Sequence, residues 1–202
     1  MDESYFLLKV KLLHIEPEIY RRFSVPQDIT LDRLHDVIQI IMGWSDCHLH
    51  QFSIKNKHYT EFPENDEMGI ESGKYRLNTL VRHKRQSFIY LYDFSDMWEH
   101  ELTIEDAKYA NPDLLLPVEC IEGERACPPE DIGGLDAYRM FIAALKDPSH
   151  ESHDFWVQWI SDQPWYPQPF NPDFFNIHYV NCELLKYLNW SRDRYHLWDG
   201  YL

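Results

Sequence analysis

Hydrophobic and polar residues alternate along the first part of the chain, over residues 5–14. A repeat of two residues is typical of a β-strand with one buried face. After a turn signal at Glu16–Glu18, residues 19–25 form a second extended run that Pro26 ends, so we expect a β-hairpin. The side chains predicted to face the core from the first strand are Phe6, Leu8, Val10 and Leu12.

The spacing of apolar residues changes to helical intervals after the hairpin. This spacing predicts a helix that begins near Asp28 or Thr30 and ends near Met42. Gly43 occupies the position after the helix, where a left-handed glycine is common. Residues 44–54 alternate again and predict a third strand. The apolar stripe of the helix consists of Leu31, Leu34, Val37, Ile38 and Ile41.

Residues 86–94 and 98–105 are rich in β-branched and aromatic side chains, which predicts two more strands. Ser95–Asp96 between them suits a tight hairpin turn. In that register Asp93 and His100 are diagonal neighbours on one face, within reach of each other. The second strand would direct Trp98, His100, Leu102 and Ile104 to one side.

The other segments complete a prediction of fold class. Residues 111–134 are rich in proline and glycine and predict a long irregular segment, while residues 161–175 should wrap the surface. We therefore expect one α+β domain over residues 1–202, with a roll-like (β-grasp-like) sheet curled around a central helix and additional C-terminal helices. A loop is expected over 61–74, and helices over 76–81, 135–145, 150–160 and 180–188.

Charge and composition narrow the classes of function. The net charge is −15, yet the chain contains 7 Trp, 13 Tyr and 11 Phe, which excludes a disordered acidic tail. Direct binding to nucleic acid is disfavoured, because it depends on Lys and Arg neutralising phosphates. The sequence shows no export signal and no apolar run long enough for a membrane, so a cytoplasmic location with reduced thiols is expected.

The first candidate site lies at the predicted hairpin turn. Asp93, Asp96 and His100 would meet there, and two carboxylates and an imidazole can bind a divalent metal or act as acid and base. In the alternative interpretation, the two aspartates accept hydrogen bonds from turn amides and His100 is bonded to Asp93, as is common for aspartates in turns.

The second candidate site is a pair of histidines, His48 and His50, which are two residues apart and would share one strand face. They could bind one metal ion together, and the adjacent Cys47 would favour a softer ion such as zinc. The alternative is that both imidazoles are half-buried and hydrogen-bonded, without a metal.

The third candidate site combines Cys120 and Cys127 with Glu130 and Asp131. Their spacing is not that of a standard zinc knuckle, so zinc would need a histidine brought in by folding. The alternative is two buried thiols followed by acids near a helix N-terminus. Aromatic residues near the C-terminus could form an exposed patch for a partner protein; they are Trp156, Trp159, Trp165, Tyr166 and Phe170.

Several long motifs stand out along the chain: Tyr20–Arg22, Leu31–His35, Gly43–Trp44 with His48–Phe52, Tyr92–His100 and Cys120–Gly134. Together they resemble the plasmid pRiA4b ORF-3-like family, whose members are also labelled transposon-associated TnpR-like passenger proteins. The resemblance covers about residues 4–160, leaving 161–202 as a C-terminal extension packed on that region. Ser95 stands where the family pattern has glycine. The resemblance implies an α/β roll-like fold without an established activity.

Two functions remain open at this point. The first is a non-enzymatic binding or accessory module that acts through protein partners, associated with mobile elements. The second is a metal-dependent enzyme, for example a hydrolase, that uses the Asp/His/Cys cluster. No cofactor follows from the sequence with certainty, although a divalent metal such as zinc fits the second function.

Overall fold

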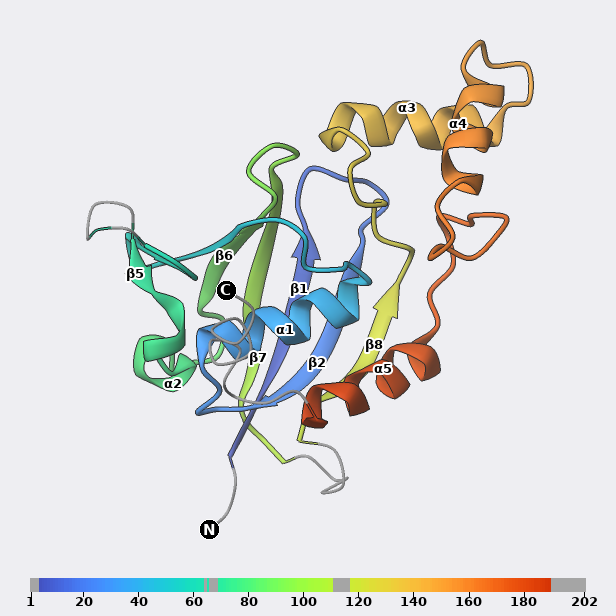
Figure 1. Ribbon diagram of the computed structural model, residues 1–202. Helices are drawn as coiled ribbons and strands as arrows, with labels where there is room; N and C mark the ends of the chain where they lie inside the picture. Colours follow the sequence, from blue (N-terminus) through green and yellow to red (C-terminus); the bar gives the residue numbers. More distant parts are fainter. Residues whose placement is uncertain (1–3, 64, 66–68, 111–116, 190–202) are drawn as a thin grey trace.

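The computed structural model describes residues 4–63, 65, 69–110 and 117–189, and its centre is an eight-stranded sheet (Figure 1). The strand order is β5-β4-β3-β6-β7-β1-β2-β8. Neighbours run antiparallel, except that β4 and β5 are parallel. The strands are β1 (Tyr5–Leu12), β2 (Tyr20–Pro26), β3 (His50–Ile54), β4 (Lys57–Thr60), β5 (Ile70–Glu71), β6 (Ser87–Tyr92), β7 (Trp98–Tyr109) and β8 (Glu119–Glu124).

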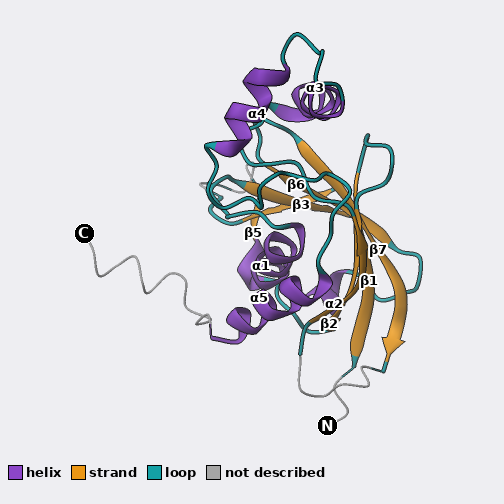
Figure 2. Cartoon of the chain, turned by 90° about the vertical axis from the view of Figure 1, so that its right-hand side faces the viewer, coloured by secondary structure: helices purple, strands orange, loops and turns teal. Residues whose placement is uncertain are grey.

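The helices divide into two groups. Helices α1 and α5 lie side by side on one face of the sheet, whereas α3 and α4 lie beyond the strand ends at the top of both views (Figure 2). The helices are α1 (Leu31–Met42), α2 (Leu77–Leu80), α3 (Gly134–Lys146), α4 (His153–Ser161) and α5 (Ile177–Asn189), with a short 3-10 helix at Ser72–Lys74. The α+β class expected from the sequence is confirmed, while the roll-like detail stays a prediction.

The hydrophobic core fills the space between the sheet and α1. The alternating residues of β1 and β7 that were predicted to share a face are all buried, and so is the apolar stripe of α1. Gly43 follows α1 with φ 91°, as the sequence predicted for the residue after the helix. The opposite face of the sheet is polar and carries ion pairs, including Lys9–Glu18 and Arg22–Glu105. Among the described residues, no helix is long and apolar enough to span a membrane.

The segment expected to be irregular contains a strand, β8, which pairs with β2 at the edge of the sheet. Its Gly123 made the segment resemble a loop, but this glycine has a packing role. An added Cβ would lie 2.6 Å from Cδ of Arg21 and 2.7 Å from the Phe175 ring. The third strand is also shorter than expected, because β3 begins only at His50 and residues 44–49 form a loop.

The hairpin between β6 and β7 has a different register from the predicted one. Tyr92 pairs with Trp98 and Tyr90 with His100, so the turn comprises residues 93–97 rather than Ser95–Asp96. Positive φ angles occur at Asp93 (56°) and Met97 (56°) and not at Ser95. The serine therefore replaces the family's glycine without backbone strain.

One buried cation joins the edge of the sheet to α1. Arg21 on β2 is 2% exposed, and all five N–H groups of its guanidinium have acceptors, at 2.7–3.6 Å. The ring of Phe175 covers it, with its centroid 3.9 Å from Cζ. The acceptors are the carbonyl oxygens of Tyr20, Ile41, Glu124 and Arg125 and the sulfur of Cys127.

Replacement of Arg21 should destabilise the fold far more than replacement of its neighbour Arg22. We expect Arg21→Met to lower the free energy of unfolding by about 3 kcal/mol, because several buried carbonyls lose a charged donor. Arg22→Met removes only partly exposed ion pairs and should cost about 1 kcal/mol or less. Urea denaturation of both variants measures the difference, and equal losses would contradict this role of Arg21.

Candidate functional site

Three loops meet at one end of the sheet and form the candidate site. The first joins α1 to β3 and carries Cys47 and His48; the second is the β6–β7 turn, with Asp93; the third follows β8 and carries Glu130 and Asp131. The indole N–H of Trp44 donates to the carbonyl of Pro128 at 3.0 Å and ties the first loop to the third. Residues 84 positions apart in sequence are thereby brought together.

Glu130 is the most firmly held residue of the site. One carboxylate oxygen accepts hydrogen bonds from the backbone N–H of Ser45 at 2.9 Å and from the hydroxyl of Tyr92 at 3.0 Å. Its backbone N–H donates to the hydroxyl of Tyr166 at 2.7 Å. Burial, followed by the charge of Glu130, raises the pKa of Tyr92 well above its usual value, so the phenol stays protonated and can donate. The other oxygen, Oε2, faces His48.

Three carboxylates surround the Nε2 atom of His48. The distances are 3.0 Å to Asp131, 3.7 Å to Asp93 and 3.8 Å to Glu130. Asp93 is 3% exposed and Glu130 7% exposed, while the side chain of Asp131 is largely open to solvent. The sulfur of Cys47, a nitrogen of His48 and a carboxylate oxygen of Glu130 all lie within 4.8 Å of one another. These separations are close to those between ligands that share one ion through bonds of about 2.0–2.3 Å.

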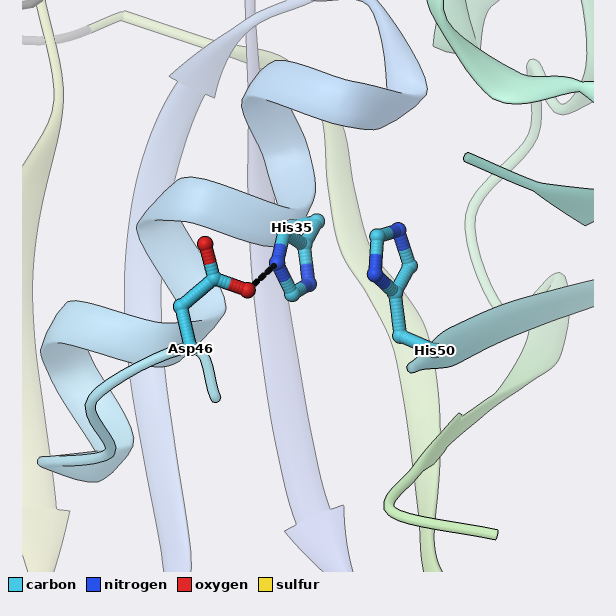
Figure 3. A group of neighbouring side chains, drawn as sticks. All are labelled: His35, Asp46 and His50. Atoms are coloured by element: carbon cyan, nitrogen blue, oxygen red, sulfur yellow. Dashed lines mark hydrogen bonds and ion pairs between the residues drawn. The ribbon is translucent and has the colours of Figure 1, made fainter. Parts of the chain in front are cut away.

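A second group, next to the first, contains His35, Asp46 and His50 (Figure 3). The two imidazoles stack face to face, with centroids 3.5 Å apart and planes 8° from parallel. Since nitrogen lone pairs lie in the ring plane, those of parallel stacked rings do not converge on one ion. This arrangement fits a packed pair of side chains better than a metal chelate, and His50 does not join His48 in one site.

His35 instead takes part in a closed ring of hydrogen bonds. Nε2 of Gln39 donates to the hydroxyl of Tyr90 at 2.9 Å, and this hydroxyl contacts Nδ1 of His35 at 2.7 Å. Nε2 of His35 contacts Asp46 at 2.7 Å, and the backbone N–H of Asp46 returns to Oε1 of Gln39 at 3.0 Å. The hydroxyl therefore donates to Nδ1, and the ring orients the loop that presents Cys47 and His48.

The predicted contact between Asp93 and His100 does not form. His100 is fully buried, its Nδ1–H donates to the carbonyl of Tyr90 at 3.2 Å, and its ring meets Trp44 edge to face. Asp93 accepts a hydrogen bond from the N–H of Ser95, as the structural alternative proposed. Asp96 accepts from the N–H of Gly133 at 3.0 Å and supports the start of α3. Asp96 and His100 therefore have structural contacts outside the site.

Cys120 and Cys127 do not contribute to either group of potential ligands in the described chain. Cys120 lies on β8 and its sulfur donates to the carbonyl of Glu122, while Cys127 contacts Arg21 and Met42. Burial raises the pKa of each thiol to about 11, so both stay protonated near neutral pH. Their contacts match the alternative of two buried thiols.

Most of the predicted aromatic patch is packed against the protein. Phe141 of α3 contacts the rings of Trp156, Trp159 and Phe170. Trp156 is buried, and Tyr166 is the hydrogen-bond partner of Glu130. Only Trp165 of the five is strongly exposed, at 66%.

Sequence reasoning missed His35, Asp46 and the supporting phenols of Tyr90 and Tyr92. A signal for His35 was present, because this polar residue falls beside the apolar stripe of α1, on the side that packs on the sheet. The phenols had no comparable signal, since tyrosines in a strand are usually read as packing residues.

Fold and site together describe an α+β protein with a histidine and carboxylates at the end of an antiparallel sheet. The sequence pattern of the plasmid pRiA4b ORF-3-like protein family matches residues 4–179, and the chain belongs to this family. The match extends past residue 160, where the expected region ended, into α5.

Two proteins are similar to this chain over most of its length. The uncharacterized protein y4hQ of Sinorhizobium fredii (strain NBRC 101917 / NGR234) is 40% identical over 166 residues, which are 79% of this chain and 82% of the relative. The crystal structure of MM3350, a protein of unknown function from Methanosarcina mazei Go1, superposes with a TM-score of 0.75 at 29% identity. That comparison covers 88% of this chain and 98% of the other.

The buried His100 should make stability depend on pH. Burial lowers its pKa to about 4, below the value near 6.5 of an unfolded histidine, so the unfolded chain binds more protons between these limits. The stability is unaffected by this group above about pH 6.5. As the pH falls towards 4, the free energy of unfolding decreases by about 3 kcal/mol in all, because only the unfolded chain gains the proton. Urea unfolding at several pH values should show a smaller acid loss for His100→Gln than for the wild type.

The exposed His83 offers a matched control for that experiment. His83→Gln should keep the full acid loss of the wild type, because the histidine is in water in both states. An identical pH dependence in His100→Gln and the wild type would contradict the argument.

Proposed function

We propose that the protein is a binding module whose principal site holds one divalent transition-metal ion between Cys47, His48, Asp93, Glu130 and Asp131. The observation that supports this most directly is the cluster of three carboxylates within 3.0–3.8 Å of one imidazole nitrogen. Zinc is the reference ion, because it binds nitrogen, sulfur and carboxylate oxygen together.

The charge of the site supports a bound cation. Asp93 and Glu130 are both buried, and buried carboxylates are costly unless positive charge compensates them. A protonated His48 would supply one positive charge for three nearby carboxylates. A divalent ion supplies two charges and leaves the imidazole neutral, with its lone pair free to bind the metal.

The types of donor atom distinguish among metals. Oxygen-only sites suit magnesium and calcium, whereas an imidazole and a thiol favour zinc and its neighbours in the first transition row. Tyr92 contacts both His48 and Glu130. Its ring lies edge to face with the imidazole of His48, and its hydroxyl donates to the carboxylate of Glu130. Such outer contacts orient ligands before the metal binds.

A second candidate function is metal-dependent hydrolysis. The specific observation in its favour is the exposure of Asp131, whose side chain is 71% accessible at the mouth of the site. Catalytic zinc sites keep one position open for water, which the metal acidifies into a nucleophile. In this proposal Asp93 and Glu130 are the buried carboxylates that hold the metal.

The biological setting is also part of the proposal. The family takes its name from an open reading frame of a plasmid, which supports an accessory role in the biology of mobile elements. The four cysteines are free thiols, as expected in a reducing compartment such as the cytoplasm. The exposed Trp165 supports contact with a protein partner.

Metal titration tests the principal proposal. The chelator-treated wild type is expected to take up one zinc ion per chain, measured by competition with a metal indicator and by elemental analysis after dialysis. His48→Ala and Asp93→Asn should each weaken zinc binding by at least about tenfold, because each removes a ligand. His83→Ala removes an exposed histidine outside the site and should bind like the wild type.

Circular dichroism of the metal-free variants separates loss of a ligand from loss of the fold. Absence of stoichiometric zinc in the wild type would overturn the proposal. Equal zinc affinity in the wild type and in His48→Ala with native spectra would also contradict it.

A further inference from the structure

A groove of about 600 Å³ lies beside the candidate metal site, between the C-terminal end of α1, the loop after β8 and the segment that leads into α5. This volume is within the usual range for sites of small organic ligands. Its walls are mainly apolar. The principal aromatic side chains are Trp165, Tyr166, Phe170, Phe174, Phe175 and Tyr179.

Three of these rings are unusually open to solvent. Trp165 is 66% exposed, Tyr179 63% and Phe174 50%. They come from separate positions along the segment before and within α5, yet all three border the same groove. Large exposed aromatic side chains gathered at a concave surface are typical of a binding site.

The charges of the described groove lining disfavour an anionic ligand. Among the described residues that line it, Arg21 is the only basic one, and all five of its N–H groups already have acceptors within the protein. The acidic residues Asp46 and Glu183 also line the groove. A phosphate or carboxylate ligand would therefore meet carboxylates, and the described lining offers it no available cation.

We infer that the groove binds a small organic cation, an ammonium group with apolar substituents. The faces of Trp and Tyr rings attract ammonium ions, and the acidic residues complement their charge. The apolar walls accommodate the substituents. The inference goes beyond the proposed metal site and is independent of it, because none of the five candidate metal ligands lines the groove.

Ligand titration with a matched pair of probes tests this inference. Choline and 3,3-dimethylbutan-1-ol have nearly the same shape. Choline has a positively charged nitrogen where the alcohol has a neutral carbon. Benzyltrimethylammonium extends the test to a larger cation. Changes in tryptophan fluorescence and in NMR spectra should show binding of both cations, with the neutral alcohol at least about fivefold weaker than choline.

Two variants and one control locate the site. Trp165→Ala and Glu183→Gln should each weaken binding of benzyltrimethylammonium by about fivefold. Phe155→Ala removes an exposed ring of α4 that does not line the groove and should leave the affinity unchanged. The titrations are made with chelator and again with zinc, and binding is expected in both, so failure of the metal proposal would not affect the result.

The inference is overturned by any of three results. The first is no binding of either cation at millimolar concentration, and the second is equal affinity for choline and its neutral analogue. The third is an affinity for benzyltrimethylammonium that Trp165→Ala and Phe155→Ala change to the same degree.

Discussion

The buried guanidinium of Arg21 is the interaction on which the site end of the structure depends. It binds carbonyl oxygens from α1, from β8 and from the loop after β8, so one side chain fixes the relative positions of three segments. Gly123 provides the space for it, and Phe175 closes over it. A neutral residue could not compensate so many carbonyl dipoles at once. The loop that contains Glu130 starts from this anchor, which explains how it reaches the loop after α1.

Local patterns were enough to predict the first three elements of the fold. The hairpin of β1 and β2, helix α1 and its closing Gly43 all follow from periodicities that a few neighbouring residues define. The errors have a different origin. Strand β8 looked irregular because it contains Gly123, whose missing side chain leaves room for Arg21, a residue far away in the sequence. The β6–β7 turn was misplaced because Asp93 and Met97 adopt positive φ angles although neither is a glycine. Both features depend on contacts that a local window does not contain.

Most residues of the candidate site could be predicted from the sequence, but which of them come together in the structure could not. His48, Asp93, Glu130 and Asp131 had each been singled out, but in three separate hypotheses. The structure joins them and removes His100, whose alternation with Trp98 places it in the core instead. The order of the strands decides which loops are neighbours at one end of the sheet, and therefore which candidate ligands meet. Strand order depends on pairing between segments far apart in the sequence.

Helix α5 packs on both α1 and β8, and its Val180 and Leu184 are part of the hydrophobic core. Helix α5 is therefore part of the same hydrophobic core as the sheet and α1, although it lies more than 50 residues after β8 in the sequence. A chain shortened at residue 160 would leave one flank of α1 uncovered and expose apolar surface to aggregation. Substitutions in α5 would consequently act on the hydrophobic core through Val180 and Leu184, while its Tyr179 and Glu183 border the groove.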